Sequence, residues 1–185
     1  MELDPQEAID RTRRWLERAV IGLGLCPFAG SVHREGRIRY VVSQAKDEAG
    51  LLEDLAVELR LLHEADPQRV ETTLLIHPLA LVDFLDYNDF LDIAESAVAA
   101  LGLEGELQVA SFHPDYQFAG TTPDDISNAT NRSPYPTLHL LRESSISRAV
   151  ETYDGIEQVG ERNAETLRRL GAEGWESLWQ DGARD

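Results

Sequence analysis

The sequence contains one cysteine and one lysine, and it has no long apolar run. Cys26 alone cannot form an intramolecular disulfide, which favours a reducing compartment. No segment reaches the roughly 18 to 20 apolar residues that span a bilayer, and the charged N-terminus lacks the apolar core of a secretory signal. We therefore expect a cytoplasmic protein that does not insert into a membrane.

Positive charge is also scarce, with 17 basic residues against 34 acidic ones and a formal net charge of −17. Nucleic acids and anionic membranes are bound by basic surfaces, so neither is an expected partner. All basic residues except Lys46 are arginines, and the arginine fork suits carboxylate and phosphate groups. The charge composition therefore leaves open a small anionic ligand, while the oligomeric state is not indicated.

The chain has 185 residues, of which 42% are hydrophobic, and this suits one domain with a substantial core. No repeat or low-complexity tract divides the sequence. We expect a single domain over residues 1–185, with residues 172–185 as a loosely held tail.

Hydrophobic periodicity predicts alternating helices and strands. Helices are expected at residues 5–22, 48–64, 79–101 (interrupted near 86–88), 145–153 and 160–170, and strands at 37–43, 72–77, 107–112 and 137–142. Asp4 and Ser144 are the expected N-caps of the first and fourth helices. Strands joined by helical crossovers are normally parallel neighbours. The expected fold is α/β, or ferredoxin-like α+β, with a single mostly parallel sheet of three to four strands, flanking helices and additional N- and C-terminal helices.

The stretch that follows the third strand, residues 113–136, has little helical or strand periodicity. An unpatterned loop of this length inside a domain is usually either functional or disordered. Tyr116, Phe118 and Tyr135 give it apolar groups to bury, which argues against disorder. We therefore expect this loop to form the wall of a functional site.

Two histidines end two of the expected strands, His77 in LLIHP and His113 in ASFHP. If these strands are parallel, both imidazoles lie at the carboxyl edge of the sheet, where open α/β sheets bind ligands. His113, oriented by Asp115, is the expected general acid or base, and His77 is expected to contact the substrate. The alternative is that each His-Pro pair only ends its strand.

Cys26 follows the first helix in the turn Cys26-Pro27-Phe28, where Pro27 blocks further helix. It is a candidate nucleophile or redox group, although the preceding helix dipole would raise its pKa. A small buried hydrophobe is the alternative reading. His77, His113 and Cys26 could instead bind zinc or iron, but no closely spaced ligand pair supports a metal.

Several polar residues after the third strand are candidates for substrate binding. Arg132 lies in the proline-restricted segment 131–136 and could grip an anion with both arms of its fork, or pair with Asp124 or Asp125. The other candidates for substrate binding are Tyr116, Asn131, His139 and Arg142.

Three segments, residues 24–29 (GLCPFA), 111–119 (SFHPDYQFA) and 131–142 (NRSPYPTLHLLR), resemble one bacterial family. It is catalogued as domain of unknown function 1415, and the likeness extends from Trp15 to about Gly171. The resemblance implies a compact, single-domain cytoplasmic bacterial protein. Because the family has no assigned activity, it implies no catalytic residues.

The sequence therefore predicts a small enzyme acting on a small anionic molecule, with its site at the carboxyl edge of the sheet. The site would combine the His-Pro-Asp-Tyr loop, the Cys-Pro-Phe turn and the Asn-Arg-Ser-Pro loop. Two alternatives stay open. One is a metal- or ligand-binding protein without turnover, and the other is an acidic protein-interaction module that presents Tyr87, Tyr116 and Tyr135.

Overall fold

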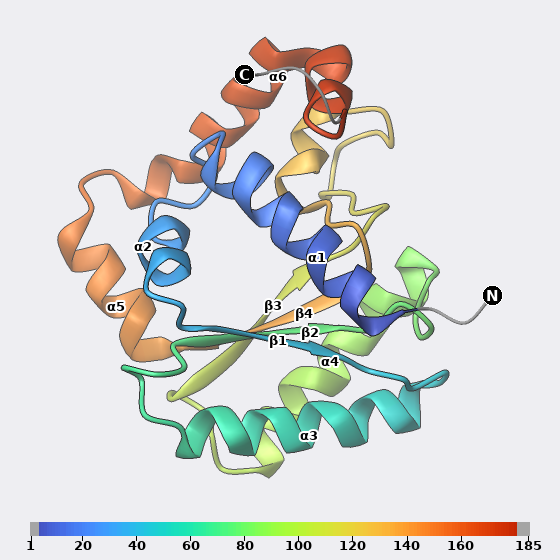
Figure 1. Ribbon diagram of the computed structural model, residues 1–185, viewed down its shortest axis with the longest axis vertical. Helices are drawn as coiled ribbons and strands as arrows, with labels where there is room; N and C mark the ends of the chain where they lie inside the picture. Colours follow the sequence, from blue (N-terminus) through green and yellow to red (C-terminus); the bar gives the residue numbers. More distant parts are fainter. Residues whose placement is uncertain (1–3, 181–185) are drawn as a thin grey trace.

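The computed structural model describes residues 4–180, and Figure 1 shows its arrangement. The helices are α1 (Pro5–Trp15), η1 (Leu16–Ile21), α2 (Ala29–Arg34), α3 (Glu48–Glu64), α4 (Phe84–Ala100), η2 (Ile126–Asn131), α5 (Glu143–Thr152), η3 (Ile156–Gln158) and α6 (Val159–Ser177). The strands are β1 (Ile38–Val42), β2 (Thr72–Ile76), β3 (Leu107–Phe112) and β4 (Thr137–Arg142). Among the described helices, none combines the length and the apolar character that a membrane-spanning segment requires.

The four strands form one sheet in the order β1-β2-β4-β3. β1 and β2 are parallel, whereas β4 runs antiparallel to both of its neighbours. The expectation of a mostly parallel sheet is therefore wrong, because the last strand returns between β2 and β3. The α/β class is confirmed at the coarser level, since β1, β2 and β3 still point in one direction and share a carboxyl edge.

Helices cover both faces of the sheet, with α3 and α4 on one side and α1 and α2 on the other (Figure 1). The α3/α4 side holds the largest apolar core. Its fully buried members include Leu51, Leu55, Leu59, Leu75, Phe90, Leu138 and Leu140. All five residues of β2 are buried, which fits a central strand covered on both faces.

The opposite face, which we call the α1 face, is packed mainly through the two edge strands. Trp15, Leu16, Ala19 and Val20 contact Ile38 and Tyr40 of β1 and Phe112 of β3. α6 bends at Gly171, whose φ of 70° is left-handed, and its end adds Trp175, Leu178 and Trp179 to this cluster. Within the expected tail, Trp175, Leu178 and Trp179 therefore contact this cluster, and residues 181–185 lie outside the described residues.

Some helix boundaries differ from expectation for identifiable reasons. α4 begins at Phe84 rather than Leu79, because the Asp83 carboxylate accepts hydrogen bonds from the backbone of Leu85 and Asp86. The expected interruption at 86–88 is wrong, since Tyr87 packs into the core there. α5 starts directly after β4, so Ser144 is not its cap. Residues 16–21 are a π-helix, and Pro27 stops a helix only until α2 begins at Ala29.

The hydroxyl of Tyr87 joins α4 to the ends of two strands. It donates to the Thr137 carbonyl at 2.9 Å and accepts from the Phe112 backbone N–H at 3.0 Å. The Tyr87 side chain is fully buried, so burial raises its pKa and keeps the hydroxyl protonated. This one group therefore holds α4 against the point where β3 and β4 meet.

Replacing Tyr87 with Phe should lower the free energy of unfolding by about 1–3 kcal/mol, because two buried backbone groups lose their partner. Urea denaturation of the wild type and the variant measures the difference. Tyr153→Phe is the matched control, since Tyr153 is 41% exposed and should change stability little. Equal stabilities for both variants would contradict the role given to the Tyr87 hydroxyl.

Candidate functional site

The two strand-end histidines lie at the same edge of the sheet, and both contact the Tyr87 ring. Ring centroids are 5.7 Å apart for His77 and Tyr87, and 5.0 Å apart for Tyr87 and His113. Both imidazoles are fully buried. The sequence thus placed them together, but at a position without solvent access.

Both histidines hold the turn between β2 and α4. His77 Nδ1 lies 3.0 Å from the Ala80 carbonyl, and His113 Nε2 lies 3.2 Å from the Leu81 carbonyl. A carbonyl only accepts, so each of these nitrogens carries the hydrogen. His113 Nδ1 in turn accepts from the Asp115 backbone N–H at 3.0 Å. The turn they hold is strained, because Leu81 has a φ of 55°.

The neutral imidazole is favoured at both positions. Burial lowers the pKa of His77 to about 4 and also lowers the pKa of His113. His113 has both nitrogens engaged with backbone groups, whereas His77 Nε2 is buried without a hydrogen-bond partner. Asp115 contacts His113 through its backbone N–H, and its side chain is exposed.

The long loop uses most of its polar side chains to fix its own shape. Arg132 donates to the carbonyls of Tyr116 and Pro123, at 3.1 and 2.8 Å, rather than to Asp124 or Asp125. Asn131 donates to the Ser111 carbonyl at 3.0 Å. The Tyr116 ring packs on Phe84 and Phe118. η2 of this loop lies against α6, so the loop is ordered and supported from outside.

Arg142 caps the end of α3. It is buried, and its Nη2 donates to the carbonyls of Leu62, Ala65 and Val70 at 2.8 to 3.0 Å. Burial is the main cause that lowers the pKa of Arg142. Its guanidinium thus satisfies carbonyls that the helix end leaves without partners.

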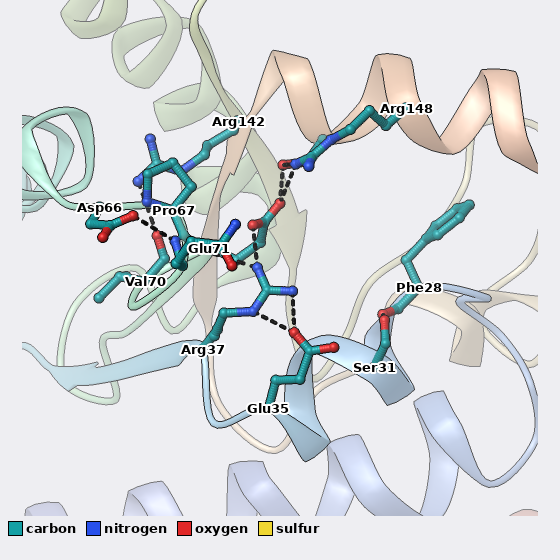
Figure 2. A network of polar contacts seen from close by, with 12 residues as sticks. Phe28, Ser31, Glu35, Arg37, Asp66, Pro67, Val70, Glu71, Arg142 and Arg148 are labelled. Carbon is teal, nitrogen blue, oxygen red and sulfur yellow. Dashed lines mark hydrogen bonds and ion pairs between the residues drawn. The ribbon is translucent and has the colours of Figure 1, made fainter.

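Beside Arg142, the buried carboxylate of Glu71 joins elements from three parts of the chain (Figure 2). It accepts from Arg37 at 2.6 Å, from Arg148 of α5 at 3.1 Å, and from the Ser145 hydroxyl. Arg37 also pairs with Glu35 after α2. These charges are paired with one another, so the network holds α2, β2 and α5 together.

Cys26 lies in the turn between η1 and α2 and is exposed, so the buried alternative is wrong. Its neighbour Leu25 is buried against Ala129 and Leu167, and the Leu25 carbonyl accepts from Asn163 at 2.9 Å. Within residues 4–180, no group of three or more His, Cys, Asp or Glu side chains is arranged to hold a metal ion. The proposed set of His77, His113 and Cys26 is therefore not assembled.

His139 is the predicted site histidine that stays partly exposed, whereas His77 and His113 are buried. It lies on the α1 face of β4, paired with Leu74 of β2 and Ala110 of β3, and is partly exposed. Its Nε2 is 2.7 Å from the Thr72 hydroxyl oxygen. That hydroxyl donates its one hydrogen to the Leu140 carbonyl at 2.6 Å. His139 must therefore carry the hydrogen on Nε2, leaving Nδ1 as a lone-pair acceptor. Burial lowers the pKa of His139 to about 4.

Two polar groups of α1 face this side of the sheet without partners. Thr12 and Trp15 are almost completely buried, and neither the Thr12 hydroxyl nor the Trp15 indole N–H has a hydrogen-bond partner. The two residues are three apart and share a face of the helix. The Trp15 ring centroid is 5.1 Å from that of Phe112, which is 5.9 Å from that of His139. We call Thr12, Trp15, Phe112 and His139 the His139 site.

Sequence reasoning missed Thr12 and Trp15 as site residues. The signal was a polar residue on the buried stripe of the first helix, where Ala8, Thr12, Trp15 and Ala19 recur at helical spacing. A second signal is structural. Trp15 immediately precedes the π-helix η1, and π-helical turns often occur at functional sites.

The arrangement defines a mixed α/β domain with one sheet, covered by helices on both faces and carrying a partly exposed imidazole on the face that α1 covers. A family model described as "Protein of unknown function (DUF1415)" matches residues 7–177. The chain belongs to this family. No curated protein and no solved structure matches this chain.

The depressed pKa of His77 should make the protein less stable in acid. The unfolded chain binds a proton at His77 near pH 6.5, whereas the folded protein resists it until about pH 4. The contribution of His77 to the free energy of unfolding is therefore fully present above pH 6.5 and is lost as the pH falls towards 4. The loss should be roughly 3 kcal/mol, with a smaller loss from the partly exposed His139.

Urea unfolding at several pH values between 4 and 7 measures this dependence. His77→Gln should reduce the slope of the free energy of unfolding against pH by up to the contribution of one bound proton. The control His63→Gln, at a half-exposed residue, should leave the curve unchanged. Parallel curves for the wild type and the His77 variant would show that His77 does not carry the effect.

Proposed function

We propose that this protein acts on a small anionic molecule bound at the His139 site, between α1 and the sheet. His139 is the group that exchanges a proton with this molecule. The observation that carries the proposal is a set of unpartnered polar groups on one side of the sheet. They are the Trp15 indole N–H and the Thr12 hydroxyl. On the same face of the sheet, the hydrogen bond of His139 Nε2 to Thr72 makes Nδ1 the acceptor nitrogen of that ring.

Buried polar groups without partners are costly, and each one in a folded protein calls for an explanation. Bound water is one explanation and a ligand is the other. The ligand is favoured because Trp15 is joined, through the Phe112 ring, to a titratable group that is partly exposed. At neutral pH the imidazole of His139 is neutral and has a free lone pair, and a bound anion would raise its pKa so that it could accept a proton.

The unpartnered Thr12 hydroxyl is expected to lower the stability of the protein, and this gives a first test. Thr12→Val keeps the side-chain shape and removes the unpartnered hydroxyl, so it should raise the free energy of unfolding by about 1–2 kcal/mol. Thr137→Val is the matched control. Thr137 is equally buried, but its hydroxyl donates to the Tyr135 carbonyl at 2.9 Å, so its loss should destabilise.

The same Thr12 variant should bind ligand less well than the wild type. The indole N–H signal of Trp15 in ¹⁵N spectra reports binding, with acetate, phosphate, sulfate, glycerol and acetamide as probes. At least one anion should move this signal in the wild type, and His139→Gln should weaken that anion's binding about tenfold, as expected for a charged hydrogen bond. Destabilisation by Thr12→Val, or a Trp15 signal that no probe moves, would contradict the proposal.

A second candidate is the edge site expected from the sequence, with His113, Asp115 and Cys26 as catalytic groups. The observation that favours it is His77 Nε2, a buried acceptor without a partner at that edge. The variant His113→Ala distinguishes a structural role of His113 in the Leu81 turn from a catalytic role. If His113 holds the Leu81 turn, the variant should lose about 1–3 kcal/mol of stability, with His33→Ala as a control. Unchanged stability with lost activity would favour the edge site.

A further inference from the structure

We infer that the free edge of β1 binds an extended, basic segment of a partner protein, which adds a strand to the sheet. The segment would lie in the groove between β1 and α3, with its positively charged side chains directed towards α3. This groove shares no residue with the His139 site, so the inference does not depend on the proposed function.

β1 is an edge strand, and no strand within residues 4–180 pairs with its outer side. Its inner side is fixed by two bonds to β2, since the Ser43 N–H donates to the Ile76 carbonyl and the Arg37 carbonyl accepts from the Glu71 N–H. Successive residues of a strand direct their backbone groups to opposite sides. The N–H and C=O groups of residues 38, 40 and 42 therefore face away from β2, and such a row is a template for another strand.

β1 lacks the sequence features that commonly protect an edge strand. Its five residues, IRYVV, include no proline and no lysine, and its one-to-one register with β2 contains no bulge. Arg39 is its one charged residue, and Glu58 of α3 neutralises it at 2.8 Å. An extended segment can therefore approach this edge without meeting an uncompensated charge on β1.

A groove of about 410 Å³ lies beside this edge. Both Val41 and Val42 line it, and their side chains point to opposite faces of the sheet, so the groove follows the edge of the strand. Its other wall is one side of α3, where Gly50, Asp54 and Val57 recur at helical spacing. Val57 is 51% exposed. The groove thus offers apolar surface next to the row of backbone groups.

The charge of the groove selects a basic occupant. Among the described residues that line it, three are acidic, Glu53, Asp54 and Glu58, and none is basic. Glu58 is paired with Arg39, whereas Asp54 accepts from the neutral Ser43 hydroxyl at 2.6 Å. Glu53 is exposed. A second copy of this chain fits less well, because each copy carries a net charge of −17.

The pleat of an added strand determines the sequence pattern of the segment. Alternate side chains of a strand point to opposite faces of the sheet. On β1, Arg39 and Val41 point to the α3 side, and Ile38 and Tyr40 point to the α1 face. We therefore expect a segment with lysine or arginine at every second position, towards α3, and with β-branched residues between them. This is recognition by strand addition, in which backbone bonds give affinity and alternate side chains give specificity.

The probe is the peptide KVRTKVRT with both ends blocked, titrated into the full-length protein by calorimetry. Two control peptides accompany it. KRKRVTVT has the same composition and charge without the alternation, and EVETEVET keeps the alternation and reverses the charge. KVRTKVRT should bind at least about tenfold more tightly than either control, and its Kd should rise with salt concentration.

Methylation of the peptide backbone tests strand addition directly. One variant carries N-methyl groups on its valines and threonines, and the other carries them on its lysines and arginines, so the side-chain charge is unchanged. Only one of these two alternate sets directs its N–H groups towards β1. One methylated peptide should therefore lose binding while the other keeps it. Equal effects of the two sets would overturn the inference.

Hydrogen exchange locates the added strand on β1. In the free protein the N–H groups of Tyr40 and Val42 face solvent and should exchange quickly, whereas that of Val41 faces β2 and should be protected. Binding of KVRTKVRT should slow exchange at Tyr40 and Val42 about tenfold or more and leave Val41 unchanged. Attraction by charge alone would not produce this alternation.

Variants of the protein test each wall of the groove. Val42→Pro removes one outward N–H and keeps the bonds to β2, so it should weaken binding of KVRTKVRT about tenfold. Val42→Thr, which keeps the N–H, is its control. Glu53→Lys reverses an exposed charge and should weaken binding about two- to tenfold. Glu95→Lys, at an exposed position of α4, should have no effect.

Three results would overturn the inference. The first is that KVRTKVRT does not bind at millimolar concentration, or binds no better than KRKRVTVT. The second is that its binding leaves exchange at Tyr40 and Val42 unchanged. The third is a dimer of the free protein that Val42→Pro separates in sedimentation experiments, because a second copy would then occupy the edge of β1.

Discussion

The return of β4 between β2 and β3 is the constraint on which the rest of the structure depends. It makes β2 and β4 the central pair, so β2 is buried throughout, and it sets His139 in the middle of the α1 face. It also separates the ends of β2 and β3 by one strand. His77 and His113 both contact one aromatic ring, that of Tyr87, whose hydroxyl holds the ends of β3 and β4.

Local sequence patterns predicted much of the fold. α3, β3 and β4 have the bounds that periodicity and turn residues indicated, and Asp4 caps α1 as expected. The direction of β4 could not be read in the same way, because strand pairing depends on contacts far apart in the sequence. Leu140 pairs with Thr73 and Val109, and no property of TLHLLR distinguishes a parallel from an antiparallel neighbour. Local signals therefore identified the strand but not its place in the sheet.

The candidate site, too, could be predicted only in part from the sequence. Sequence reasoning found His139 but assigned the leading role to His113, since a histidine before a polar loop looks reactive. In the structure, backbone groups of Leu81 and Asp115 occupy both nitrogens of His113. Arg132 and Arg142 are likewise engaged by carbonyls. Residue type indicates what a side chain can bind, but only the surrounding backbone shows whether that capacity is already used.

The polar loop gains its order from these same engagements. Asn128 accepts from the Phe118 backbone and donates to the Thr122 carbonyl, and it is fully buried. Internal bonds of this kind replace the regular ladders of helices and strands. This explains how a segment without periodicity can hold one shape. Its role as the wall of a functional site stays a prediction. The loop supports the end of the sheet and gives α6 a surface to pack on.

The bend at Gly171 has a consequence for how the chain is made. It brings Trp175, Leu178 and Trp179 onto the cluster around Trp15, and Leu178 accepts a hydrogen bond from Arg18, 160 residues earlier. Synthesis on the ribosome proceeds from the N-terminus, so the first helix waits for its cover until the far end of the domain emerges. Within this domain, α1 is therefore synthesised long before the residues that cover it, and its apolar face stays incompletely covered until the end of α6 is made.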